Sequence, residues 1–166
     1  MPIEIRRIEY GTPAAAELLD QMDAEMGALY ADVRGARDPG MGELIAVALT
    51  VHPEEMVATV GAFDDDELVG HAALRPFELR PFEQALEVKR VFVRADYRGQ
   101  GISKQLMLEL EAIARERGAS SLILQTGDRQ QEAISLYTRL GYVPIERFGA
   151  YAPIPFFLCF GKSLAV

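Results

Sequence analysis

The sequence predicts an α+β fold in which a mixed, largely antiparallel sheet carries helices on both faces. The main observation is the order of the local patterns, which run strand, helix, two or three strands, helix, strand, helix and two strands. A second observation is that no repeat, low-complexity tract or linker interrupts them. A chain of 166 residues is long enough to bury one hydrophobic core. We therefore expect a single domain over residues 1–166.

The N-terminal part of the chain reads as a strand, a helix and a loop. Residues 3–8 are strand-like, and Thr12 followed by Pro13 predicts a helix with Thr12 as its N-cap. Apolar residues recur at helical spacing over residues 14–32. Residues 34–42 are rich in glycine and charge, which predicts a loop.

The middle of the chain contains three predicted strands. Residues 57–63 and 67–74 read as two of them, and the three aspartates at positions 64–66 predict the hairpin turn between them. The third is predicted over residues 86–93. Residues 44–51 are apolar and fit either a strand or a helix.

Two helices and three strands complete the pattern. An amphipathic helix is predicted over residues 101–117 and ends at Gly118, and another over residues 129–140 ends at Gly141. A strand of the buried type lies between them at residues 121–125. The final strands are expected at residues 142–145 and 156–160.

Composition and charge argue against several classes of protein. The net charge of −8 argues against nucleic-acid binding, and an acidic surface favours a cationic amine substrate over an anionic one. No apolar run is long enough to cross a bilayer, and residues 1–9 do not resemble a signal peptide. The single cysteine, Cys159, excludes an internal disulfide and lies in an apolar run typical of a buried residue. We expect a cytoplasmic protein that binds no membrane.

A glycine-rich turn, Arg98-Gly99-Gln100-Gly101-Ile102-Ser103, separates the predicted strand 86–93 from the helix that follows it. The N–H groups in the first turn of a helix have no partner within the helix, and the helix dipole adds partial positive charge there. Glycine permits a positive φ and a close approach of backbone to ligand. The turn therefore predicts a site for a phosphate-bearing cofactor.

The spacing of this turn distinguishes between phosphate-binding loops. The dinucleotide-binding pattern requires a third glycine where Lys104 stands, and the P-loop pattern is absent. Arg98, Gly101 and Ser103 instead fit the pattern Q/R-x-x-G-x-G/A, with serine at the last small position. This turn resembles the acetyl-CoA loop of the GNAT superfamily of N-acetyltransferases.

A second stretch strengthens the resemblance. Ala133, Tyr137, Gly141 and Tyr142 match the spacing of the family's pattern N-x-x-A-x-x-x-Y-x-x-x-G-F/Y, and Gln130 stands where asparagine is usual. The similarity is close over residues 86–142 and looser over the rest of the chain. Both signatures occur in the expected elements and at the expected separation.

The resemblance implies acetyl-CoA as co-substrate and a sheet that splays between the strands at 86–93 and 121–126. The pantetheine arm would pair with backbone groups of Val91, Phe92 and Val93. The N–H groups of residues 98–103 would bind the pyrophosphate, the Arg98 side chain would add charge, and Gln130 would contact the cofactor. A basic cluster supports this: Lys89, Arg90, Arg94, Arg98 and Lys104.

The implied reaction is direct transfer of an acetyl group to a primary amine, with a backbone N–H of strand 86–93 stabilising the oxyanion. Glu87 is the candidate base, because histone-type members place a glutamate eleven positions before the residue that matches Arg98. The alternative is a glutamate paired with Lys89, Arg90 or another exposed base on a solvated strand face. Tyr137 is the candidate general acid toward the thiolate; the alternative is an aromatic residue packed on the sheet.

Other candidates are weaker. The two histidines, His52 and His71, lack ligand spacing, so we expect no metal site, and His71 fits a structural role. Family geometry places Tyr30, Asp32 and Tyr151 near the acceptor site.

The resemblance leaves alternatives open. One is a non-catalytic CoA-binding sensor or interaction module, and another is a different acyl group. The acceptor is a small-molecule amine or a peptide amine, which the sequence does not specify. The family and the apolar segment at residues 154–160 are consistent with a homodimer.

Overall fold

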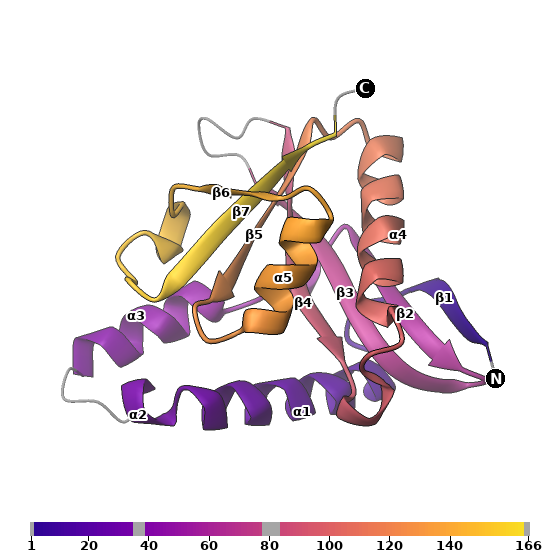
Figure 1. The fold of residues 1–166 in the computed structure, drawn as a ribbon, viewed down its shortest axis with the longest axis horizontal. Helices are drawn as coiled ribbons and strands as arrows, with labels where there is room; N and C mark the ends of the chain where they lie inside the picture. The colour runs from indigo at the N-terminus through magenta and orange to yellow at the C-terminus, as the bar shows by residue number, and fades with distance from the viewer. Residues whose placement is uncertain (1, 35–38, 78–83, 165–166) are drawn as a thin grey trace.

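The computed structural model describes residues 2–34, 39–77 and 84–164, and within them a seven-stranded sheet has the order β1-β2-β3-β4-β5-β7-β6 (Figure 1). Its strands are β1 (Ile3–Ile8), β2 (Ala58–Asp64), β3 (Glu67–Phe77), β4 (Ala85–Val93), β5 (Ser121–Gly127), β6 (Val143–Ile145) and β7 (Phe157–Ser163). β4 and β5 are parallel, and the other neighbouring strands are antiparallel. The predicted α+β fold with a largely antiparallel sheet is confirmed.

Helices cover both faces of this sheet (Figure 1). The α-helices are α1 (Pro13–Leu29), α2 (Ala31–Arg34), α3 (Pro39–Leu49), α4 (Ile102–Glu116) and α5 (Gln131–Arg139), and the 3₁₀ turns are η1 (Pro53–Glu55), η2 (Ala95–Tyr97) and η3 (Gly149–Tyr151). α4 and α5 pack over one face, whereas α1, α3 and η3 pack over the other.

The alternation of side chains along β4 explains why two buried charged residues, Glu87 and Lys89, lie on the same face of the sheet. Leu86 and Val88 lie in the core beneath α4. Ala85 lies in the core beneath α3 and η3. Because successive side chains of a strand point to opposite faces, Glu87 and Lys89 share the face of Ala85.

Local signals in the sequence match the structure at two turns. Thr12 caps α1, its hydroxyl accepting a hydrogen bond from the Ala15 N–H at 3.3 Å, and the N-cap prediction is confirmed. Asp64 pairs with Glu67 across the β2–β3 hairpin, which leaves the aspartates at 65 and 66 as its two-residue turn.

The structure corrects some predicted boundaries. The ambiguous residues 44–51 belong largely to helix α3, which begins at Pro39 within the predicted loop; residues 35–38 lie outside the described residues. Ile45 and Ala48 are both buried at helical spacing, so packing selected the helix. The helix predicted over residues 14–32 is divided into α1 and α2, because Tyr30 leaves helical geometry with ψ of 19°.

The sheet splits between β4 and β5. Their pairing runs only from Ala85 opposite Ser121 to Val88 opposite Leu124. Beyond this point β4 bulges: its register with β3 shifts, and Arg90 has a φ of 59°. A bulge bends its strand and increases its twist. The splay implied by the family resemblance is therefore present.

Candidate active site

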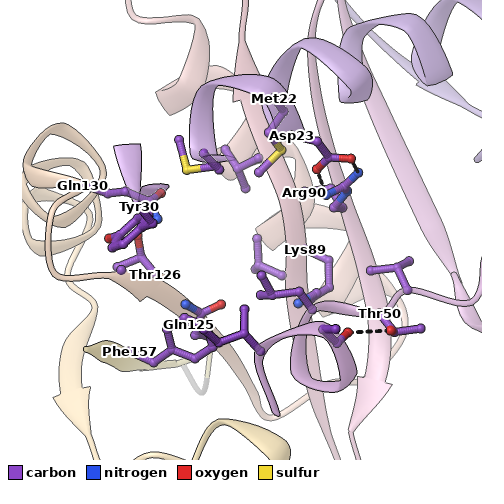
Figure 2. A pocket seen from close by; sticks show the side chains of 18 of the residues that line it. Met22, Asp23, Tyr30, Thr50, Lys89, Arg90, Gln125, Thr126, Gln130 and Phe157 are labelled. Atoms are coloured by element: carbon purple, nitrogen blue, oxygen red, sulfur yellow. Dashed lines mark hydrogen bonds and ion pairs between the residues drawn. The ribbon is translucent and has the colours of Figure 1, made fainter. Parts of the chain in front are cut away.

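A cavity of about 580 Å³ lies where β4 and β5 separate (Figure 2). Val88 and Tyr137 contribute to its wall from the face covered by α4 and α5, and Ile45 and Lys89 contribute from the face covered by α3. The cavity thus extends through the gap in the sheet. Much of the remaining wall is apolar, from Met22, Met26, Leu49, Val51, Phe156 and Phe157.

The glycine-rich turn opens α4 as predicted. Gly99 has a φ of 80° and Gly101, the N-cap of α4, a φ of 77°. A Cβ added at either position would meet no atom within 4 Å. Glycine is thus required there by the backbone conformation, and the space above it is open to a ligand. Ile102 is buried and anchors the helix start, whereas Gln100 is exposed and Ser103 is half-buried.

Arg98 has partners of its own in the protein. Its Nε donates to the Val93 carbonyl at 2.9 Å, and its Nη2 donates to the Glu25 carboxylate of α1 at 2.7 Å. Its backbone N–H donates to the Ala95 carbonyl at 3.4 Å. The side chain therefore joins the turn to the end of β4 and to α1, and Glu25 balances its charge.

The backbone of β4 beyond the split is placed for a strand-like partner. Phe92 and Val93 are buried and pair on one edge with His71 and Gly70 of β3. On the other edge, pairing with β5 stops at Val88. Val91 is half-buried and lines the cavity.

Two residues from the second signature reach the cavity wall. Tyr137 of α5 lines the cavity, and its ring lies 5.9 Å from that of Tyr142. Burial raises the pKa of the Tyr137 phenol, so it keeps its proton at neutral pH. Gln130, the N-cap of α5, also lines the wall, and its backbone N–H donates to the Gly127 carbonyl at 3.1 Å. Tyr137 thus both packs on the sheet and faces the cavity.

Glu87 lies in a buried cluster of polar side chains. One of its carboxylate oxygens accepts from Arg75 Nε at 2.7 Å and the other from the Tyr151 hydroxyl at 2.5 Å. Lys89 Nζ donates to the same hydroxyl at 2.6 Å and lies 3.9 Å from the Glu87 carboxylate. Arg75 is directly opposite Glu87 in the β3–β4 register. Glu87 is fully buried, and of these four residues only Lys89 belongs to the cavity wall.

The surroundings of Lys89 change its acidity. Burial lowers the pKa of the Lys89 ammonium to about 8, the positive charges of Arg75 and Arg90 contribute to the shift, and Glu87 opposes it. Burial and the Glu87 charge raise the pKa of Tyr151, which therefore stays protonated. The wall thus carries a lysine that titrates near neutral pH.

The bulge of β4 is held from both sides. Arg90 donates to the Asp23 carboxylate of α1 at 2.7 Å, and its carbonyl accepts from His71 Nδ1 at 2.8 Å. His71 is fully buried, and burial lowers its pKa, so the ring is neutral. Its structural role, predicted from the sequence, agrees with this contact.

The C-terminal end of α1 is joined to the loop after β5. The Tyr30 hydroxyl accepts from the Arg129 N–H at 3.0 Å, and Asp32 pairs with the Arg129 guanidinium at 2.6 Å. A Cβ added at Gly127 would lie 1.9 Å from the Tyr30 hydroxyl, so the contact requires glycine. Of the three predicted acceptor-site residues, Tyr30 lines the cavity, whereas Asp32 and Tyr151 are not part of its wall.

Two further predictions concern absent features. Within residues 2–34, 39–77 and 84–164, no group of three or more histidine, cysteine or acidic side chains is placed to hold a metal ion. None of the helices described here has the length and apolar character to span a membrane.

Cys159 is buried, and burial raises the pKa of its thiol to about 11, which disfavours the reactive thiolate.

Comparison with known proteins identifies the family of this chain. Residues 35–142 match the acetyltransferase (GNAT) family, and these residues are more than half of the chain. The chain belongs to the GNAT family. Its glycine-rich turn and the tyrosine on α5 belong to the two signatures on which the sequence resemblance rested, and the split sheet is what that resemblance implied.

Individual relatives support the same conclusion. This GNAT protein is 30% identical over 158 residues to an IAA acetyltransferase of Azospirillum brasilense, an alignment that covers 91% of each chain. A crystal structure from Klebsiella pneumoniae, assigned as an acyl-CoA N-acyltransferase, is 28% identical, with a TM-score of 0.76 and 98% of each chain covered. The PaiA N-acetyltransferase of Thermoplasma acidophilum, in complex with coenzyme A, shares the fold at 21% identity, with a TM-score of 0.67 and coverage of 98% and 99%. The chain is therefore an acyl-CoA N-acyltransferase.

Sequence reasoning missed part of this GNAT site. It named Lys89 only as a member of a basic cluster and as a partner of Glu87, and it did not name Arg75. The two-residue spacing of Glu87 and Lys89 indicated that they share a face of a strand. Their meeting with Arg75 and Tyr151 depends on strand register and on the path of the chain after β6.

Proposed function

We propose that this enzyme transfers an acetyl group from acetyl-CoA directly to a primary amine held in the cavity at the split of β4 and β5. The observation that carries the proposal is that the cavity extends through the sheet. A thioester placed along the β4 edge and an amine entering between α1 and α3 would meet there. The apolar side chains of the wall would also limit competing attack by water.

The glycine-rich turn and the β4 edge fit the proposed co-substrate. Backbone N–H groups of Gly99 through Ser103 would hold the pyrophosphate at the start of α4. The backbone of Val91, Phe92 and Val93 would pair with the amide groups of the pantetheine arm, and Gln130 would contact it from α5. The guanidinium of Arg98 is already held by Val93 and Glu25. Arg98 would therefore stabilise the glycine-rich turn and would not contact the phosphates itself. Acetyl-CoA supplies an activated acyl group on a thiol leaving group.

Tyr137 would provide the proton for the departing sulfur. It lies in the cavity wall on the α5 side, opposite the face that carries Lys89. Burial keeps its hydroxyl protonated, as a general acid requires. Backbone N–H groups of β4 beyond Val88, left without a β5 partner, would stabilise the oxyanion.

Glu87 does not line the cavity, and it would accept the amine's proton indirectly. Both of its carboxylate oxygens are engaged, and the side chain does not reach the cavity. Tyr151 and Lys89 form the connection between this carboxylate and the wall, through hydrogen bonds of 2.5 and 2.6 Å. Glu87 would therefore act as a base through this chain.

The test measures acetyl-CoA binding by calorimetry and then, on the same sample, free-thiol release across a panel of amines. Binding with amine-dependent thiol release is the expected result and identifies the acceptor class. Binding without release for any amine would replace the enzyme by a CoA-binding module, and absence of binding would overturn the proposal. Succinyl-CoA in the same assay tests the acyl preference.

A further inference from the structure

Lys89 is the residue through which the buried Glu87 cluster meets the cavity. Resting on the proposed function, we propose that Lys89 in its neutral form takes the proton directly from the acceptor's ammonium group. Tyr151 and Glu87 then act as positioning residues that hold and reset Lys89. The proposal concerns the step before acyl transfer, in which the amine becomes a nucleophile.

The Lys89 amine lies between the cavity and the buried cluster around Glu87. Its side chain lines the cavity, yet only 7% of it is exposed to solvent. Figure 2 shows Lys89 in the wall beside Arg90. Its Nζ has one hydrogen bond at its inner side, to the Tyr151 hydroxyl at 2.6 Å. The nitrogen can therefore meet an acceptor while staying connected to the cluster behind it.

The other titratable groups of this wall are less suited to the role. Asp23 is held in an ion pair by Arg90, whose own guanidinium does not deprotonate. Tyr30 already accepts the Arg129 N–H, and Tyr137 is needed as the acid. The ring of Tyr10 packs edge-on against His71, with ring centroids 5.8 Å apart. Lys89 is left as the base in the described wall.

Charges on each packed element set the behaviour of Lys89. Arg75 faces it from β3, Tyr151 from η3 and Cys159 from β7, while Glu87 and Arg90 lie on its own strand. With its pKa lowered to about 8, Lys89 has a larger neutral fraction near pH 7 than an ordinary lysine. The same positive surroundings favour the neutral form of an acceptor amine in the cavity.

The proposed step balances its protons as follows. The acceptor ammonium gives one proton to the neutral Lys89 Nζ and becomes a neutral amine. The amine forms a bond to the thioester carbonyl carbon, the carbon–sulfur bond breaks, and the sulfur takes the Tyr137 proton. The nitrogen then gives its second proton to Tyr137. Lys89 passes the acceptor's first proton to Tyr151 as Tyr151 passes its own proton to Glu87. After the product leaves, the proton moves back through Tyr151 to Lys89, which gives it to water in the open cavity and becomes neutral again.

The test compares Lys89→Met and Lys89→Arg with the wild type on two acceptors. One is the best alkylamine of the panel; the other is hydroxylamine, which is small and largely neutral at pH 7, with its uncatalysed reaction subtracted. General-base catalysis contributes roughly 100-fold or more. We therefore expect Lys89→Met to lower kcat/KM for the alkylamine by about 100-fold, with a much smaller loss for hydroxylamine. Acetyl-CoA affinity should be unchanged.

The arginine variant separates charge from basicity. Arginine keeps the positive charge but stays protonated, so we expect Lys89→Arg to be as impaired as Lys89→Met. Recovery of activity in Lys89→Arg, or an equal loss for both acceptors in Lys89→Met, would overturn the proposal. Wild-type protein that acetylates no amine would instead remove the proposed function itself.

A second variant guards against misfolding of the lysine variants. Tyr151→Phe keeps the ring and removes the hydroxyl that accepts from Lys89. Without that acceptor the charged form of Lys89 is less stable, so the rise of kcat/KM with pH should move to lower pH. An unchanged pH profile in this variant would contradict a proton-accepting role for Lys89.

Discussion

The Nδ1 atom of His71 lies 2.8 Å from the carbonyl oxygen of Arg90, the residue at which β4 bulges away from the regular register. His71 is fully buried on β3 and is not part of the cavity wall. Its N–H supports a backbone carbonyl at a residue whose φ is 59°, where a side chain is strained. A histidine outside the cavity thus helps to determine where β4 leaves β5.

The buried His71 should make stability depend on pH. Burial lowers its folded-state pKa below the ordinary value of 6.5, so the unfolded chain binds this proton more readily. The stabilisation is complete above the unfolded value and is lost as pH falls toward the lowered folded value. The slope from this residue does not exceed about 1.4 kcal/mol per pH unit. Denaturant unfolding at pH 5 to 8 measures it, and His71→Asn should flatten the curve; parallel curves would contradict the assignment.

Two glycines with the same backbone conformation allow the proposed CoA-binding role of the glycine-rich turn to be tested. Gly101 and Gly118 have φ values of 77° and 75°, and a Cβ at either would meet open space. Alanine at each position should destabilise the protein by about 1–2 kcal/mol through backbone strain. Only Gly101→Ala should also weaken acetyl-CoA binding measured by calorimetry, and Gly101→Val should abolish it. Normal affinity in Gly101→Val would remove the loop from the binding site.

Tyr137→Phe should lower kcat more than it lowers acetyl-CoA affinity. The variant removes the hydroxyl and keeps the ring that packs near Tyr142, so a loss of about 100-fold in kcat is expected for an acid. Tyr142→Phe is the matched control, because its hydroxyl donates to Glu111 and not into the cavity. Equal turnover by Tyr137→Phe and wild type would exclude the acid role.

Lys162→Met should reduce stability without changing the cavity. Lys162 Nζ donates at 2.6 Å to the buried carboxylate of Glu111 on α4, and Tyr142 donates to the same oxygen at 3.2 Å. Loss of one partner leaves a buried charge poorly satisfied and should destabilise the fold by roughly 1–3 kcal/mol. Arg7→Met, which breaks exposed pairs with Glu116, should have a much smaller effect on denaturant unfolding. Similar losses in both variants would contradict this ranking.

The sequence predicted those features of the site that depend on nearby residues. The turn at Gly99 and Gly101 and the start of α1 at Thr12 were predicted because each depends on the backbone preferences of a few adjacent residues. The position of Tyr137 followed from its spacing within one helix. All the residues that produce such a signal lie within about one turn of helix or one hairpin.

Tertiary structure alone decided how the buried cluster at the cavity is assembled. Arg75 meets Glu87 through antiparallel register, and Tyr151 arrives from a segment more than sixty positions later in the chain. The apolar segment at residues 44–51 fitted a strand or a helix equally well from its sequence. Packing of Ile45 and Ala48 against residues of β4 and β7 selected the helix. Long-range pairing and packing bring these groups into contact, and neither leaves a local pattern in the chain.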